Sequence, residues 1–139
     1  MDIAAALEFA RTTRNGVLTT VKRDGRPQLS NISYAVGDDG VIRVSITADR
    51  AKYANLRRDS RASLYVGRAD FMAYAVIDGD AALAPVAADP NDTTVEALIS
   101  LYRSLIGEHA DWDDYRRAMV ADQRTVLSIT PTHAYGWLG

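Results

Sequence analysis

Side chains that could hold a ligand follow one another between residues 28 and 52. Gln28 and Asn31 lie in one strand-like segment, and Ser45 lies in the next. Their amide and hydroxyl groups suit the edge of a polar heterocycle. Arg50 and Lys52 come soon after, at the expected start of a helix, where side-chain cations and free backbone N–H groups can bind one phosphate together. The spacing therefore predicts a site for a nucleotide-like ligand.

The charges of the chain are separated along its length. Residues 50–68 hold six basic residues and one acid, whereas residues 78–122 hold ten acids and three arginines. Because the net charge is −2, this separation favours a local anion site over a generally basic surface for nucleic acid. A basic helix paired by salt bridges with an acidic one would explain the same pattern. Single residues also have simpler explanations, such as a Gln28 that faces water or a Lys52 that lies along an apolar surface.

Several kinds of chemistry lack their residues or motifs. The absence of cysteine excludes disulfides, thiolate metal sites and cysteine nucleophiles, and only His109 and His133 offer imidazole to a metal. The chain has no GxSxG, P-loop, GxGxxG or HExxH motif. Asp113 and Asp114 are neighbours on an expected helix, so their side chains point about 100° apart and do not suit paired-carboxylate hydrolysis. No apolar run approaches the roughly 18 residues of a membrane span. Because cysteine is absent and histidine scarce, we expect a cytoplasmic protein without a metal centre.

The hydrophobic pattern predicts six strands, with helices at the start, in the middle and near the end. The expected strands are Gly16 to Lys22, Pro27 to Val36, Val41 to Thr47, Ala62 to Val66, Met72 to Leu83 and Arg124 to Trp137. The expected helices run from Asp2 to near Asn15-Gly16, from Ala48 to Asp59, from Asp89-Pro90 to Gly107 and from Trp112 to Val120. The third strand alternates apolar and polar residues, as a strand with one buried face does, and Gly79 suits a bulge. Hairpin-like succession predicts an α+β fold, a mostly antiparallel six-stranded β-barrel with peripheral helices, in one domain over residues 1–139.

The order of these segments resembles a known superfamily. The segments that carry the resemblance are GVLTTVKRDGRPQLSNISY, VSITADRAKYANLRRDSRASLYV, YAVIDGDAAL and VEALISLYRSLIGEHADWDDYRRAM, followed by the last strand. They are similar to the split-barrel superfamily of pyridoxamine 5′-phosphate oxidase-like flavoproteins, and within it to the actinobacterial deazaflavin (F420)-dependent oxidoreductases. The resemblance covers nearly the whole chain.

The resemblance implies an FMN-binding type of split barrel that forms a homodimer and binds its cofactor at the subunit interface. It also implies a set of cofactor-binding residues. These are Arg50 and Lys52 for the phosphate, Gln28 and Ser45 beside the ring system, Asn31 and Arg26 as further candidates, and Met72 and Tyr74 from the other subunit. Met72 stands where we expect an aromatic residue, which bears on stacking at that edge and on the choice of substrate.

The cofactor that the resemblance implies is coenzyme F420, with FMN as the alternative. An F420 enzyme would transfer a hydride between the deazaflavin and a small unsaturated or quinone-like substrate, and would need no nucleophile of its own. An FMN-dependent enzyme like pyridoxamine-phosphate oxidase and a non-catalytic F420-binding or storage protein remain open. No catalytic residue is assigned, although Tyr34 and Tyr74 are candidate proton donors. Only Tyr53 and Tyr65 interleave the basic run, so no nucleic-acid partner is expected.

Overall fold

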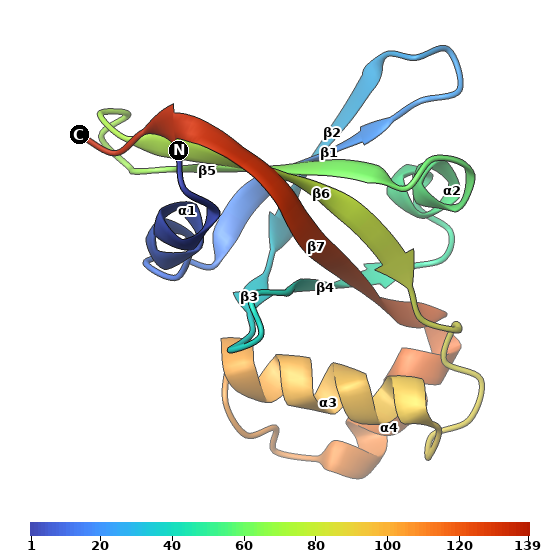
Figure 1. The fold of residues 1–139 in the computed structure, drawn as a ribbon. Coiled ribbons are helices and arrows are strands. Elements are labelled where there is room, and N and C mark those ends of the chain that lie inside the picture. The colour runs from blue at the N-terminus through green and yellow to red at the C-terminus, as the bar shows by residue number, and fades with distance from the viewer.

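The computed structural model describes residues 1–139 as an α+β fold built on one curled sheet (Figure 1). Seven strands run in the order β2-β1-β5-β6-β7-β4-β3, and all neighbouring strands are antiparallel. The strands are β1 (Asn15–Val21), β2 (Pro27–Ser33), β3 (Ala35–Val36), β4 (Ile42–Thr47), β5 (Arg61–Gly67), β6 (Tyr74–Leu83) and β7 (Arg124–Trp137). The helices are α1 (Ile3–Ala10), α2 (Ala51–Arg58), α3 (Thr93–Leu105) and α4 (Trp112–Ala121). None of them combines the length and the apolar character that crossing a membrane requires.

The seventh strand arises where the predicted strand over residues 27–36 breaks at Tyr34. Its ring is buried and its hydroxyl donates to the Ala10 carbonyl at 2.7 Å, which anchors this residue against the end of α1. Before Tyr34, β2 pairs with β1; after it, β3 pairs with β4. β2 and β3 are therefore consecutive in the chain but stand at opposite ends of the strand order, so the sheet must curl until its ends approach each other. The result is a half-barrel of seven strands instead of the predicted six.

Three helix starts or ends differ clearly from the predicted ones. The helix expected from Asp89-Pro90 begins at Thr93, because the Asp92 carboxylate, not that of Asp89, accepts the capping hydrogen bond from the Val95 N–H at 2.9 Å. α1 ends at Ala10, because Asn15 already belongs to β1. The helix expected from Ala48 begins at Ala51, because the Ala48 N–H donates to the carbonyl of Gln123 at 3.0 Å. The segment in front of α2 is thus held to the start of β7 instead of joining the helix.

The predicted alternation along β4 and the predicted bulge in β6 are confirmed. The three apolar residues of β4 are buried and the three between them are half-buried on the other face: Ile42, Val44 and Ile46 against Arg43, Ser45 and Thr47. The register between β6 and β7 shifts between Asp78 and Gly79. A Cβ at Gly79 would lie 2.5 Å from the Thr130 carbonyl oxygen, so the close approach of the two strands there requires glycine.

Two clusters of buried side chains hold the fold together. The larger cluster of 17 residues fills the inside of the curled sheet and includes Leu18, Leu64 and Ile77. The smaller cluster of seven joins α3 and α4 to β7 through Leu98 and Val126. Each fully buried aliphatic side chain contributes about 1.5–3 kcal/mol. The core therefore fixes the curvature that sets β2 opposite β4.

Candidate anion-binding site

A cavity of about 370 Å³ lies in the open seam where β2 faces β4. β2 pairs only with β1, and β4 beyond Arg43 pairs only with β7, so each strand turns one unpaired edge toward the seam. Backbone N–H and C=O groups on such edges are free to bind a ligand. The cavity is lined by Asn31, Ile32 and Ser33 of β2, Val44 to Thr47 of β4, Arg50 and Lys52 at the start of α2, and Arg124 of β7.

Three of the lining residues, Arg50, Lys52 and Arg124, are cations, and none of them takes part in the six ion pairs of the chain. Burial lowers the pKa of the Lys52 ammonium, and the charges of the two arginines lower it further. The Nε of Arg124 is buried without a hydrogen-bond partner, and its Nη1 has only long contacts with Ser45, at 3.4 and 3.5 Å. An anion in this cavity would offset the repulsion among the three cations.

One acid, Asp49, lies close to these cations without neutralising them. Its carboxylate accepts a hydrogen bond from the Thr47 hydroxyl at 2.6 Å, which lowers the pKa of Asp49, and Arg50 and Arg124 lower it to a smaller extent. Asp49 is exposed and forms no ion pair within 4 Å. The cavity therefore keeps an excess of positive charge.

Arg124 is the functional candidate that sequence reasoning missed. It reaches the cavity because the pairing of β4 with β7 sets it opposite Thr47. The residue before it, Gln123, has a φ of 54°, and its carbonyl holds the loop in front of α2. An arginine at the start of a predicted strand was the only signal, and the register of two strands so far apart in the chain cannot be derived from local pattern.

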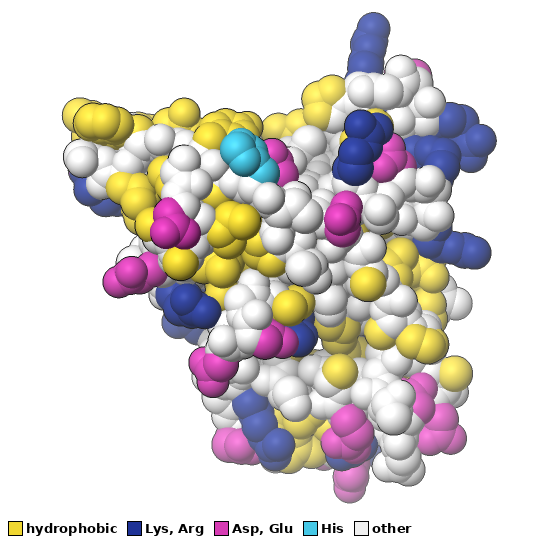
Figure 2. Space-filling model, viewed as in Figure 1, with side chains coloured by type: hydrophobic (Ala, Val, Ile, Leu, Met, Phe, Trp, Pro, Cys, Tyr) yellow, Lys and Arg dark blue, Asp and Glu magenta, His cyan; other side chains and the backbone are white.

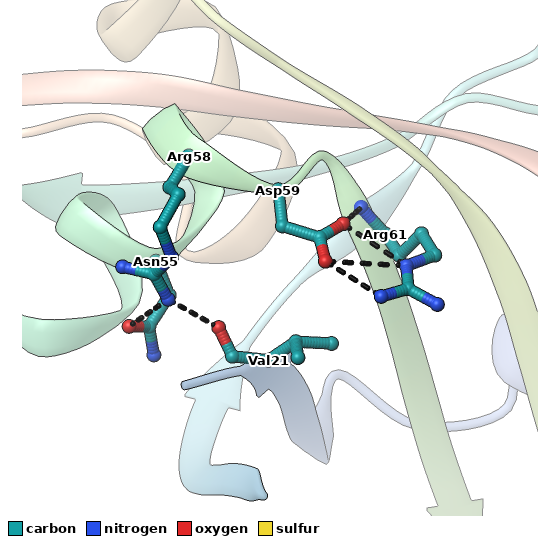
Figure 3. Close-up of polar contacts among 5 residues, drawn as sticks. All are labelled: Val21, Asn55, Arg58, Asp59 and Arg61. Atoms are coloured by element: carbon teal, nitrogen blue, oxygen red, sulfur yellow. Dashed lines mark hydrogen bonds and ion pairs between the residues drawn. The ribbon is translucent and has the colours of Figure 1, made fainter. Parts of the chain in front are cut away.

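Polar contacts fix α2, which carries Lys52, against β1. The Asn55 amide donates to the Thr20 hydroxyl at 3.0 Å, and both residues are buried. Arg58 donates to the Val21 carbonyl at 2.7 Å and to the Asn55 side-chain oxygen at 3.2 Å (Figure 3). The start of α2 is therefore placed at the cavity by contacts made at its far end.

The turn from α2 into β5 is closed by one arginine–carboxylate pair. Arg61 Nη2 lies 2.7 Å from Asp59, and the Arg61 backbone N–H also donates to that carboxylate at 3.1 Å (Figure 3). The hydrogen bonds from the Arg61 side chain and backbone lower the pKa of Asp59 to about 2. This part of the basic segment is thus satisfied locally, unlike the cations of the cavity.

The separation of charge along the sequence is also a separation in space. Figure 2 shows Lys and Arg side chains at the corner formed by the β1–β2 hairpin and α2, whereas acids lie among arginines over α3 and α4. None of the six ion pairs joins residues 50–68 to residues 78–122. The alternative hypothesis of a basic helix paired with an acidic one is therefore wrong.

The structure brings together half of the eight predicted site residues. Those that line the cavity are Asn31, Ser45, Arg50 and Lys52. Gln28 lies further along β2, and Arg26 is exposed in the hairpin turn before it. Met72, expected to begin a strand, lies instead in the turn after β5 and is 64% exposed, while Tyr74 stacks on Tyr65 at a ring-centroid distance of 5.9 Å. These four residues do not line the seam cavity of their own chain.

A second cavity, of about 580 Å³, adjoins the first along Asn31, Ile32 and Ser33, which line both. Its other lining residues are Asn15, Gly16, Val17, Tyr65, Gly67, Arg68, Ala69 and Phe71. The two cavities together offer a cationic end and an end with aromatic side chains. Such a combination suits a ligand that carries a phosphate on one side and a ring on the other.

The family model described as pyridoxamine 5′-phosphate oxidase matches residues 3–138. The chain therefore belongs to the pyridoxamine 5′-phosphate oxidase family. Among solved structures, it is similar to a conserved hypothetical protein of Mycobacterium tuberculosis, Rv2991, with 26% identity and a TM-score of 0.75, over 99% of this chain and 85% of that one. It is also similar to an F420 reductase, with 27% identity and a TM-score of 0.69, over 92% of this chain and 94% of the other. A putative pyridoxamine 5′-phosphate oxidase from Listeria innocua, at 19% identity and a TM-score of 0.64, shares the fold over 96% and 94% of the two chains.

Proposed function

We propose that this chain is a coenzyme F420-dependent oxidoreductase that transfers a hydride between the deazaflavin and a small unsaturated or quinone-like substrate. The observation that carries the proposal is the group of three cations without acidic partners at the open seam, one of which has a buried, unpaired Nε. The similarity to an F420 reductase at 27% identity supports the choice of F420.

Different residues of the cavity would bind the phosphate and the ring system of the cofactor. Arg50, Lys52 and Arg124 would bind the phosphate by charge-assisted hydrogen bonds. Asn31, Ser45 and the unpaired edges of β2 and β4 would meet the polar edge of the ring system. Bound deazaflavin supplies two-electron hydride chemistry, so the protein has to orient the ring, exclude water and hydrogen-bond the charge that develops.

Gln28 and Arg26 remain proposed ligands at the edge of this arrangement. β2 runs from the exposed hairpin at Arg26 to the cavity at Asn31, and Gln28 lies between them. A ligand that extends from the cavity along the free edge of β2 would reach Gln28 before Arg26.

We also propose that two copies of the chain form a homodimer, and that Met72 and Tyr74 complete the cofactor pocket of the partner. Apolar side chains gather where the β5–β6 turn and the end of β7 meet, at the upper left of Figure 2. Met72, Tyr135 and Trp137 are each 48–65% exposed. A patch of this kind favours burial against a second copy. Solution mass at micromolar concentration checks this; a monomer would contradict it.

One observation favours FMN as a second candidate cofactor. The three cations of the cavity suit the two negative charges that a phosphate monoester such as that of FMN can carry. The same fold would then serve an FMN-dependent oxidase.

Titration of the purified protein with F420 and FMN side by side tests the proposal. We expect saturable F420 binding and oxidation of reduced F420 by a panel of quinones and enones. Tight retention of FMN without F420 binding would support the FMN alternative. Saturable F420 binding without turnover of the reduced cofactor by any member of the panel would instead indicate a binding or storage protein.

A further inference from the structure

Phe71 has a conformation and an exposure that nothing within the chain offsets. It lies in the turn between β5 and β6 with a φ of 61°, in the left-handed region that disfavours bulky side chains. Its ring is 85% exposed, so the chain gains almost no burial from it. A strained backbone that displays an apolar ring to solvent is the kind of feature that functional sites retain.

The turn around Phe71 is held closed by four hydrogen bonds. The Phe71 N–H donates to the Arg68 carbonyl and the Arg68 N–H to the Ala73 carbonyl, both at 2.9 Å. The Asp70 carboxylate accepts from Arg68 Nε at 2.8 Å and from the Met72 N–H at 2.9 Å. Glycine usually occupies the left-handed position of such a hairpin turn. Here the bonds around the position hold a phenylalanine in it.

Phe71 lines the larger of the two adjoining cavities. Tyr65 lines the same cavity from β5, and Asn31 and Ser33 form the wall shared with the cationic cavity. A ligand whose phosphate is held by the cations and which continues past this wall reaches a space with two aromatic side chains. Aromatic side chains at a cavity favour a flat conjugated partner, because offset stacking combines apolar contact with complementary ring charge.

We infer that the turn Arg68–Met72 is a ring-binding element, in which Phe71 is held in a strained conformation to stack on a planar conjugated ring. The ring comes either from the cofactor or from the substrate that the cofactor reduces. This inference deepens the proposed function by assigning the specificity end of the same site. It also makes a claim about stability that does not depend on which cofactor is bound.

The test compares Phe71→Gly with Phe71→Tyr, and with Ile106→Ala as the matched control. Glycine removes the ring and relieves the positive φ, whereas tyrosine keeps both the ring and the strain. Ile106 is another exposed apolar residue, 68% exposed, and it lines neither cavity. The probes are riboflavin, which has the flavin ring but no phosphate, the quinone menadione, and inorganic phosphate.

We expect Phe71→Gly to weaken binding of at least one ring probe by about tenfold, the scale of one aromatic stacking contact. Phosphate binding should stay within about twofold of the wild type, and Tm should not fall, because the lost ring had no packing and the lost strain was unfavourable. Phe71→Tyr and Ile106→Ala should bind the ring probes like the wild type. Loss of riboflavin binding assigns the ring to the cofactor, and loss of menadione binding assigns it to the substrate.

Three results for binding and stability, and one for assembly, would overturn the inference. The first is that Phe71→Gly binds riboflavin and menadione as the wild type does. The second is that the Tm of Phe71→Gly is lower than that of the wild type. The third is that the wild type binds neither riboflavin nor menadione. A loss of dimer mass in Phe71→Gly with ring binding intact would also overturn it, by assigning Phe71 to the contact between two copies. Failure of the proposed function is distinguishable, because it would appear as absent F420 and FMN binding while riboflavin or menadione still bound in a Phe71-dependent way.

Discussion

Arginines lie both at the seam between β2 and β4 and in the layer formed by α3 and α4. The two regions differ in whether these arginines form ion pairs with acidic residues. In the helical layer, Arg103 pairs with Glu108 at 2.9 Å and lies over the Trp112 ring at 4.8 Å, and Arg116 pairs with Glu96 at 2.7 Å. At the seam, the cations have no acidic partner. A high density of positive charge therefore does not by itself indicate an anion-binding site. The cations of the seam indicate one because they have no acidic partner.

The aromatic side chains show the same contrast. The rings of Tyr102, His109, Trp112 and Tyr115 pack around one another, edge-on or tilted, at α3 and α4. The Tyr115 hydroxyl donates to the Leu98 carbonyl at 3.1 Å. Phe71, which lines the second cavity, has the opposite character, because it is displayed to solvent. The helical layer is a stabilising element, and the seam and the adjoining turn are where ligand binding would lower the free energy of unpaired groups.

The largest expected effect comes from reversing one charge at the seam. Arg124→Glu would replace a charge-assisted contact with repulsion, so we expect cofactor affinity to fall by more than about 3 kcal/mol, roughly 150-fold. Arg103→Glu on α3 makes the same change of charge in the satisfied region and should leave affinity within twofold. Titration of both variants with F420 and FMN measures the difference, and equal losses would break the contrast between the two regions.

A smaller effect is expected from truncation of Lys52. Lys52→Ala should weaken cofactor binding by about 1–3 kcal/mol, or about 5- to 150-fold, because one charge-assisted contact is lost. Arg57→Ala, on the same helix but outside the cavity, is the control. Unchanged affinity in Lys52→Ala would place the phosphate elsewhere.

A substitution in the layer formed by α3 and α4 should lower the free energy of unfolding and leave cofactor affinity unchanged. Tyr115→Phe removes the hydroxyl that donates to Leu98 and leaves a buried carbonyl without that donor, so unfolding should become easier by about 1 kcal/mol. Denaturant unfolding measures this, and titration should show unaltered cofactor affinity. A loss of affinity would mean that the two regions are coupled.

The smallest expected effect concerns acid stability at the end of α2. The pKa of Asp59 is lowered to about 2, so its pair with Arg61 stabilises the fold above about pH 4 and this contribution is lost as the pH falls toward 2. The Tm of Asp59→Asn should therefore lie below that of the wild type at pH 6, and the two should converge toward pH 2. Parallel curves over that range would show that the carboxylate does not act through this pair.

Much of the fold follows from local pattern, and the exceptions have tertiary causes. Alternation along Ile42–Thr47 and the bulge at Gly79 were predictable because side-chain period and glycine chemistry are local properties. The break at Tyr34 was not, because it depends on a hydroxyl reaching the carbonyl of Ala10. The half-barrel with an additional strand follows from that single break.

The residues of the candidate site also separate into those predictable from local sequence and those placed by tertiary structure. Arg50 and Lys52 could be predicted from their place at a helix start, and Ser45 from its position on a polar strand face. Arg124 joins them only through the register of β4 against β7. The strain at Phe71 depends on the closure of a turn whose sequence, Arg68 to Met72, contains no glycine to mark the left-handed position.

Competition by inorganic phosphate tests most directly whether the unpaired cations of the seam form the anion site. F420, or FMN if it is the cofactor that binds, is titrated into the wild type and into Arg124→Gln at increasing phosphate concentration. We predict that phosphate weakens cofactor binding to the wild type in a saturable, competitive manner, and that Arg124→Gln binds the cofactor more weakly and needs more phosphate for the same effect. Cofactor binding that is insensitive to phosphate in the wild type, or identical in the two proteins, would contradict this account.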